Sequence, residues 1–408
     1  MRGASDEPLL RNRGFRRLWL GDAVSLLGDW FTYVALGTLV VAADQGLIGV
    51  AFVLLGHSLP RVLCGPWAGR LADRIDRRTI LIAFSLLRAL TVLAMMAAAQ
   101  AQALALVQAL LFVRMAFGAF IDPAATAMLP QLVAGDRIAR ANALIGATWS
   151  VMFALGVAIG GIVTASIGPL AALAVDASTF VIAALVFASL PRSPPRPKDR
   201  DPRDPAPTRE GGWAIAWRRP ELLAAALAKI PAALANGGAW VLLHARAGEE
   251  PFGATALSLG ILHAARAIGT GIGPLAWVGP LRGSEWGLRL GNLVALIGVA
   301  GFALVDDPAL MLAAVLVWGL GMGANWVTAT TRMQVASAND QLGRVASVDL
   351  VAHSLSQCVG GLFGAWLADR WLDPTLSAWW GALAGLLGWL AVGVLVRTSA
   401  REHGLPSR

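Results

Sequence analysis

The sequence predicts an all-α membrane protein with twelve spanning helices arranged as two pseudo-symmetric halves of six. Three observations predict this fold class: the composition, a series of long apolar segments with mostly short connections, and an internal repeat. Of the 408 residues, 57% are hydrophobic and 14% are charged, against roughly 25% charged residues in an average soluble domain. This composition excludes a disordered chain, a disulfide-stapled secreted domain and most soluble enzymes.

Hydropathy predicts where each helix lies, because a spanning helix needs about 20 mostly apolar residues. The first apolar segment is too long for the core of a signal peptide and lacks a cleavage site, so we expect a mature helix there. The twelve predicted spans are residues 18–42, 47–69, 79–100, 103–127, 142–166, 169–190, 221–245, 254–278, 287–305, 309–331, 345–368 and 376–396.

The connection at residues 191–219 differs from the others because it is long and rich in Pro and in charges of both signs. This composition is typical of a solvated linker. The segment around Trp213 and Trp217 could instead lie on the membrane surface. The linker predicts three parts: an N-terminal half (1–190), a cytoplasmic linker (191–219) and a C-terminal half (220–408).

The distribution of Lys and Arg predicts the orientation. When residues 1–17 are placed inside, the inside segments hold 26 of the 33 bases and most outside loops hold none. Basic residues favour the cytoplasmic side of a membrane, so we expect both termini in the cytoplasm. The net charge of +8 is then a topology signal, and no nucleic-acid partner is expected because no single exposed domain carries it.

An internal repeat appears when the chain is shifted by 204 residues. Paired glycines and charged residues then coincide without gaps, and two parallel six-helix halves are the architecture of one large class of transporters. The matches are Gly65 and Gly69 with Gly269 and Gly273, Gly156 and Gly160 with Gly360 and Gly364, Asp136 and Arg140 with Asp340 and Arg344, Arg78 with Arg282, and Ser150 with Ser354.

The segment from Gly69 to Arg78, GRLADRIDRR, resembles the loop between spans 2 and 3 of the major facilitator superfamily. Glycine permits close helix approach, and Asp73 can pair with an arginine or face a helix N-terminus. We expect a conformational latch formed by Gly69, Asp73, Arg77 and Arg78 with the start of span 11 at Arg344. The alternative is a merely basic cytoplasmic loop.

Further segments resemble the drug:proton antiporter-3 group, which contains macrolide-efflux and enterobactin-exporter proteins. The resemblance implies a twelve-helix, proton-driven exporter of amphipathic compounds in the bacterial cytoplasmic membrane, and we expect a monomer. Gly156–Gly161 also resembles an antiporter motif, with Val157 in place of its proline. The segments are 25–30 (SLLGDW), 59–61 (LPR), 88–90 (RAL), 123–124 (PA), 129–130 (LP), 141–144 (ANAL) and 343–345 (GRV).

Ionisable residues within the predicted spans indicate where protons are coupled. Each costs about 2.5–3.5 kcal/mol at the centre of a helix, so it must face a cavity or a partner. A buried carboxylate takes up a proton more readily, and a neighbouring guanidinium opposes this. We expect Asp29 to carry the proton, with Arg114 or Arg88 as its switchable partner. Asp22 and Asp122 are second choices, and Asp–Arg pairs that merely pin the helices are the alternative, which we favour for Asp176.

Aromatic and polar residues of several spans are candidates for the substrate path, because aromatic rings stack on apolar compounds. Many tryptophans must instead be interfacial anchors, and a membrane histidine such as His353 is often only a satisfied hydrogen-bonding residue. Arg266 could bind an anionic group or pair with Asp349. The candidates are Trp30, Trp149, Trp318, Asn325, Trp326, His353, Gln357 and Arg266.

Signals for an enzyme are absent from the sequence. It has no Walker loop, nucleophile elbow or zinc-protease motif, and its five histidines have no metal spacing. We therefore expect no enzyme activity, metal or cofactor, and the partners to be a small-molecule substrate, protons and the lipid bilayer. The alternatives are an importer or a lipid or siderophore transporter of the same fold and, more remotely, a membrane enzyme or receptor.

Overall fold

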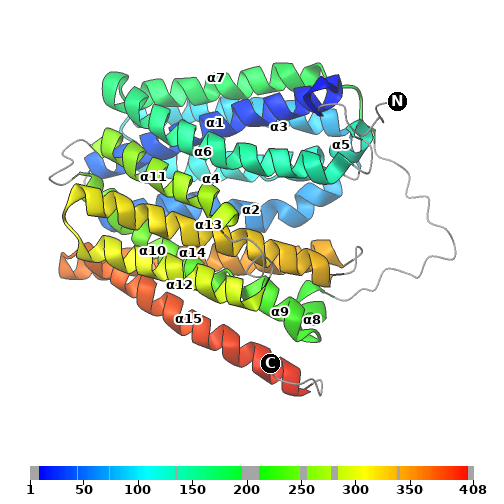
Figure 1. Cartoon of the computed structure of the whole chain (residues 1–408). Coiled ribbons are helices and arrows are strands. Elements are labelled where there is room, and N and C mark those ends of the chain that lie inside the picture. Colours follow the sequence, from blue (N-terminus) through cyan, green and yellow to red (C-terminus); the bar gives the residue numbers. More distant parts are fainter. Residues whose placement is uncertain are drawn as a thin grey trace. The chain divides into compact units, whose positions relative to one another are not determined.

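The computed structural model describes residues 9–43, 45–72, 74–133, 137–194, 211–248, 255–276, 284–337 and 341–402. Within this part of the chain the secondary structure is helical, and eleven helical segments are long and apolar enough to cross a membrane. A further helix, α11 (Thr255–Ala276), coincides with the predicted eighth span and carries His263 and Arg266 within its apolar sequence. The predicted all-α membrane fold is confirmed (Figure 1).

The helices group into two compact units, and the first contains the N-terminal spans. It comprises Met1–Ala43, Leu55–Lys198 and Ala254–Ala264, so it also includes the beginning of α11. Within it, α1 packs against α6 and α7, and α3 packs against α4 and α7. Its elements are η1 (Leu9–Arg11), α1 (Arg13–Ala42), most of α2 (Gly46–Ala72), α3 (Arg77–Gln100), α4 (Leu104–Gly118), α5 (Ile121–Leu132), α6 (Ile138–Ile167) and α7 (Pro169–Ala188).

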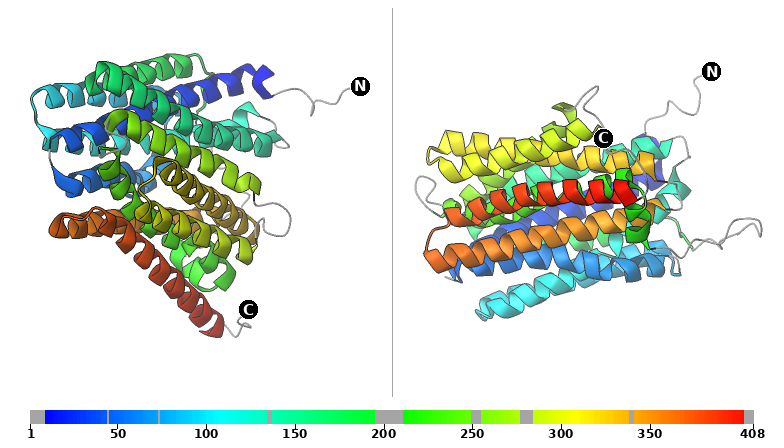
Figure 2. Two further views of the ribbon diagram at one scale, coloured as in Figure 1. Left: turned by 60° about the vertical axis from the view of Figure 1, so that its left-hand side comes forward. Right: turned by 90° about the horizontal axis from the view of Figure 1, so that it is seen from below.

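The second unit comprises Asp44–Leu54, Asp199–Gly253 and Ala265–Arg408. Within it, α10 packs against α14 and α15, which lie side by side in Figure 2, and α12 packs against α13. Its elements are the start of α2, α8 (Gly212–Trp217), α9 (Pro220–Leu227), α10 (Ile230–Ala247), most of α11, α12 (Glu285–Leu304), α13 (Pro308–Ala336), α14 (Leu342–Trp371) and α15 (Thr375–Glu402).

Two of the predicted spans are interrupted helices. Span 4 consists of α4 and α5, and span 7 consists of α9 and α10. A proline lacks the N–H that would bond to the carbonyl four residues earlier. Pro123 therefore cannot bond to Ala119 in the first break, and Pro231 cannot bond to Leu227 at the end of α9. The sequence contained the signal, but hydropathy alone does not detect a break.

The 204-residue repeat relates two equivalent helix crossings, one in each unit. In the first, a Cβ added at Gly156 of α6 would lie 2.7 Å from Cβ of Trp30 on α1. In the second, a Cβ added at Gly360 of α14 would lie 2.1 Å from the carbonyl oxygen of Leu234 on α10. Trp30 and Leu234 are themselves 204 residues apart. Both units thus use a glycine to bring the same pair of helices together.

Candidate functional site

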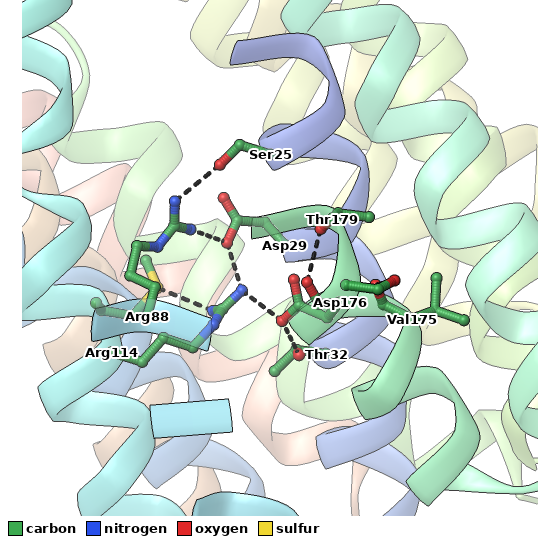
Figure 3. Close-up of polar contacts among 10 residues, drawn as sticks. Ser25, Asp29, Thr32, Arg88, Arg114, Val175, Asp176 and Thr179 are labelled. Carbon is green, nitrogen blue, oxygen red and sulfur yellow. Dashed lines mark hydrogen bonds and ion pairs between the residues drawn. The ribbon is translucent and has the colours of Figure 1, made fainter. Parts of the chain in front are cut away.

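Asp29 of α1 lies at the centre of a buried charged cluster in the first unit (Figure 3). Its Oδ1 accepts hydrogen bonds from Nη2 of Arg88 on α3 and from Nη2 of Arg114 on α4. Nη1 of Arg88 also donates to Oγ of Ser25, one turn before Asp29, at 2.8 Å. The structure therefore brings together the predicted proton carrier and both of its predicted partners.

Asp176 of α7 is the second carboxylate of this cluster. Its Oδ2 accepts a hydrogen bond from the same Nη2 of Arg114, at 2.9 Å, and another from the hydroxyl of Thr32. Arg114 thus lies between two carboxylates from different helices. The sequence analysis favoured a structural role for Asp176, and it did not predict that Asp176 and Asp29 share one guanidinium.

The four ionised side chains balance in charge but differ in access to solvent. Arg114 and Asp176 are completely buried and the Arg88 side chain is 4% exposed, whereas 15% of the Asp29 side chain is exposed. The Arg88 guanidinium lies 3.9 Å from the ring centroid of Phe180 on α7, a cation–π contact that covers it further. Asp29 is therefore the most exposed member of the cluster.

The two second-choice carboxylates are not salt-bridged to the cluster, although Asp22 interacts electrostatically with Asp29, Arg88 and Asp122. Asp22 is half-buried in α1, and Asp122 is exposed in the first turn of α5. No ion pair among the described residues joins Asp22 or Asp122 to Asp29, Arg88 or Arg114. Their roles in proton coupling stay predictions.

Trp30, the residue after Asp29, and Trp149 are two of the substrate-path candidates, and they pack together. Their ring centroids are 5.7 Å apart in an edge-to-face arrangement, and both rings contact Phe153 of α6. Trp149 is 38% exposed. The result is an aromatic surface that begins one residue after Asp29.

In the second unit, Trp318, Asn325 and Arg266 are engaged with protein groups. Trp318 is completely buried, and the Arg266 guanidinium lies 5.1 Å from its ring centroid. Nη1 of Arg266 donates to Oδ1 of Asn236 at 2.9 Å, so Arg266 does not make the suggested pair with Asp349. Nδ2 of Asn325 donates to the carbonyl oxygen of Ala228 at 3.3 Å.

A lysine–aspartate pair that the sequence analysis did not predict lies among the remaining candidates. Nζ of Lys229 donates to Oδ2 of Asp349 at 2.6 Å and lies 3.9 Å from the ring centroid of Trp326. Trp326 meets His353 edge-to-face at 5.1 Å, and His353 is hydrogen-bonded to Gln357. The positions of Asp349, His353 and Gln357 at every fourth residue of α14 were the available signal.

The predicted latch is only partly described. Asp73 lies outside the described residues. Arg77 donates to Oγ of Ser193 and to the carbonyl oxygen of Pro194, each at 3.4 Å, and Arg78 donates to the carbonyl oxygen of Ala188. These bonds tie the start of α3 to the last residue of α7 and to the segment that follows it.

Two further latch residues are described. A Cβ added at Gly69 would meet no heavy atom of the described residues within 4 Å, so the expected close helix approach is not observed there. Arg344 lies in the first turn of α14. Its carbonyl oxygen would be 1.9 Å from a Cβ added at Gly212 of α8, which shows that α8 packs tightly on α14.

Comparison with known proteins identifies the family. The model of the Major Facilitator Superfamily matches residues 18–245, which is more than half of the chain. The chain belongs to this superfamily. The fold agrees: the crystal structure of a bacterial homologue of the human lysosomal transporter Spinster, inward-facing and unoccupied, superposes with a TM-score of 0.73 at 14% identity and covers 98% of this chain and 97% of that one.

Curated relatives of this superfamily member include efflux proteins. The multidrug efflux pump Tap of Mycolicibacterium fortuitum is 29% identical over 40% of this chain and 42% of its own length. Macrolide efflux protein A of Streptococcus pyogenes is 27% identical over 46% of this chain and 47% of its own length. The chain thus spans less than half the length of these relatives. The predicted membership of a transporter family, rather than of an enzyme family, is confirmed.

Proposed function

We propose that this protein is a proton-coupled exporter of hydrophobic or amphipathic small molecules. The observation that carries the proposal is the bond arrangement at Asp29, a partly exposed carboxylate that holds two guanidiniums. Export, rather than import, is supported by the relatives named as efflux proteins. Proton coupling is supported by the chemistry of the cluster.

The cluster can link a proton to a conformational change in two steps. When Asp29 takes up a proton, it loses its charge and its ion pairs with Arg88 and Arg114 weaken. Arg114 still has a partner, because Asp176 accepts from it at 2.9 Å. The Arg114 guanidinium can therefore move from α1 toward α7 without being left unpaired, which avoids for Arg114 the several kcal/mol that an uncompensated buried charge costs. Arg88 loses its carboxylate in this step and keeps the Ser25 hydroxyl and the Phe180 ring.

We further propose that the two six-helix halves, joined by the linker at 191–219, alternate access to a substrate site near the bilayer midplane. Trp30 and Trp149 in the first unit would supply aromatic surface to the substrate. The distribution of bases supports cytoplasmic termini, and we propose a monomer in the bacterial inner membrane. In this scheme the latch residues Asp73 and Arg344 would hold the cytoplasmic side closed.

Transport by purified protein in liposomes tests the proposal. Erythromycin is the probe, because one relative is a macrolide efflux protein. We expect an imposed pH gradient to drive erythromycin across the membrane. We also expect protons to move in the opposite direction, which a pH-sensitive dye inside the liposomes measures. Erythromycin flux that is independent of the pH gradient would contradict coupling. Movement of erythromycin in the same direction as the protons would favour an importer.

The variant Asp29→Asn locates the coupling site. It keeps the size of the side chain but cannot carry a proton, so we expect probe flux to become independent of the pH gradient while the protein still inserts and binds erythromycin. Asp306→Asn is the matched control, because its side chain is 93% exposed. An unchanged pH response in Asp29→Asn would move the coupling role to another residue.

A further inference from the structure

The interruption between α9 and α10 places a lysine at an irregular point of a membrane span. The amide of Ala232 donates to Oδ1 of Asn292, at 3.2 Å, instead of to the carbonyl of Ala228. That carbonyl oxygen accepts from Nδ2 of Asn292, at 3.0 Å, and from Nδ2 of Asn325, at 3.3 Å. Irregular backbone at membrane depth occurs where it is buried in protein or lines a cavity, and transporters often form ligand sites at such breaks. Lys229 is the residue at this break.

The ammonium group of Lys229 is fully engaged. It has three N–H donors, and three groups surround it: Oδ2 of Asp349 at 2.6 Å, Oγ1 of Thr330 at 3.4 Å and the Trp326 ring at 3.9 Å. An anionic ligand would have to separate a buried ion pair to reach it, which is costly in a medium of low dielectric constant. Lys229 therefore holds the carboxylate in place rather than offering a site of its own.

Asp349 and His353, by contrast, each have an unused polar atom. Oδ1 of Asp349 and Nδ1 of His353 are buried and have no hydrogen-bond partner among the described residues. Asp349 as a whole is 7% exposed. The two residues are four positions apart on α14, so their side chains share one helix face. A buried acceptor without a donor is destabilising, and a donor supplied by a ligand would remove this cost.

An apolar surface lies beside these two atoms. The ammonium of Lys229 lies over the ring of Trp326 on α13, Trp326 and His353 meet at right angles, and 44% of Trp326 is exposed. We propose that Lys229, Asp349, His353 and Trp326 form a binding site for an uncharged aromatic or alicyclic ligand that carries a hydroxyl or amide N–H. The ligand's ring lies against Trp326, and its donor bonds to Oδ1 of Asp349.

Charge balance selects an uncharged donor. The Lys229–Asp349 pair is already neutral, so a cationic ligand would leave a net positive charge in the site. In the first unit, Asp29 holds two cations only because Asp176 supplies a second negative charge. No second carboxylate pairs with Lys229 in the described part of the chain. The proposal deepens the proposed export function by naming one class of compound that the second unit binds, and it rests on that function only for the direction of transport.

Three matched probes test the class of ligand. They are 2-naphthol, which has a hydroxyl donor; 2-methoxynaphthalene, which has the same rings but no donor; and 2-naphthylmethylamine, which is protonated at neutral pH. Equilibrium dialysis with purified protein in detergent measures binding without any gradient, so its outcome is independent of proton coupling. We expect 2-naphthol to bind saturably and about tenfold more tightly than the methoxy compound, and more tightly than the amine.

Two double variants locate the donor's partner. Lys229→Met with Asp349→Asn removes the charges but keeps a side-chain oxygen at Oδ1, whereas Lys229→Met with Asp349→Leu removes the acceptor. We expect the first to retain the preference for 2-naphthol over 2-methoxynaphthalene and the second to lose it, roughly tenfold. Both variants lack the ion pair, so a purely structural role would affect them equally.

Several outcomes overturn the proposal. These are equal binding of all three probes, tightest binding of the amine, no saturable binding of 2-naphthol, or an unchanged preference in the variant with leucine at 349. None of them bears on the pH-driven flux of erythromycin, which is coupled to protons at the Asp29 cluster. Conversely, a protein without proton-driven flux would still show the expected difference between the naphthalene probes.

Discussion

The two units use equivalent positions of the repeat for different chemistry. In the first unit, Arg88 of α3 bonds to Asp29 on α1. The position 204 residues later is Asn292 of α12, which bonds to backbone groups instead: it accepts from the amide of Ala232 and donates to the carbonyl of Ala228. The same helix pair is thus joined by charges in one unit and by neutral hydrogen bonds in the other.

The position of Arg114 shows the same contrast. Its repeat equivalent is Trp318, and both residues are completely buried. Arg114 bridges two carboxylates, whereas Trp318 presents an aromatic ring to Arg266. The two units therefore share the packing of equivalent helices but not the ionisable side chains at equivalent positions. We therefore expect the first unit to respond to protons and the second to hold a single neutral pair.

The largest expected effect comes from removing the shared guanidinium. Arg114→Met leaves two buried carboxylates, Asp29 and Asp176, without this partner, so we expect the free energy of unfolding to fall by about 3–5 kcal/mol. Titration with a denaturing detergent in mixed micelles measures it. The control is Arg289→Met, which breaks a half-exposed pair with Glu285 and should cost less than about 1 kcal/mol. Equal losses in the two variants would show that the cluster is not a buried network.

The second prediction compares whether a second substitution restores the stability that a first one removes, in each of the two units. Lys229→Met leaves Asp349 buried and unpaired, and we expect a loss of about 3 kcal/mol. Adding Asp349→Asn should restore most of it, because this pair involves one charge of each sign. In the first unit, Arg114→Met with Asp29→Asn should stay destabilised, because Asp176 has still lost its guanidinium. The same unfolding titration gives both coupling energies, and full recovery in the first unit would contradict the shared-cation geometry.

The third prediction concerns the two equivalent glycine crossings. Gly360→Ala forces a methyl group against the backbone carbonyl of Leu234, whereas Gly156→Ala meets chiefly the Trp30 side chain. Overpacking costs about 1–3 kcal/mol, and we expect Gly360→Ala near the upper end and Gly156→Ala near the lower end. Thermal unfolding in detergent ranks them. Gly65→Ala is the control, since its added Cβ meets no described atom within 4 Å, and a reversed ranking would contradict the packing.

The smallest effect is expected for a substitution that breaks an ion pair on the surface. Glu285→Gln removes an ion pair with Arg289 in which both side chains are more than 40% exposed. Exposed pairs contribute roughly 0.2–1 kcal/mol, so we expect thermal unfolding close to that of the unmodified protein. A loss as large as that of Lys229→Met would remove the distinction between buried and surface charges on which the comparison rests.

Much of the fold and part of the site were predictable. Every predicted span coincides with a helix or with an interrupted pair of helices, because hydropathy is summed over about 20 neighbouring residues. Asp29, Arg88 and Arg114 were predicted as a group because ionisable residues in apolar spans need partners. The pair of Lys229 and Asp349 was not predicted, since the two residues are 120 positions apart and lie on different helices.

The sequence by itself determined the membrane fold, the positions of the apolar helices, the repeat and the residues whose burial requires a partner. Each follows from local composition or from a fixed offset along the chain. Only the tertiary structure decided which partner each residue has: that Asp176 shares Arg114 with Asp29, that Arg266 contacts Asn236 and not Asp349, and that Pro231 leaves Lys229 at a break. The reason is that pairing depends on helix rotation and crossing, which packing between distant segments sets.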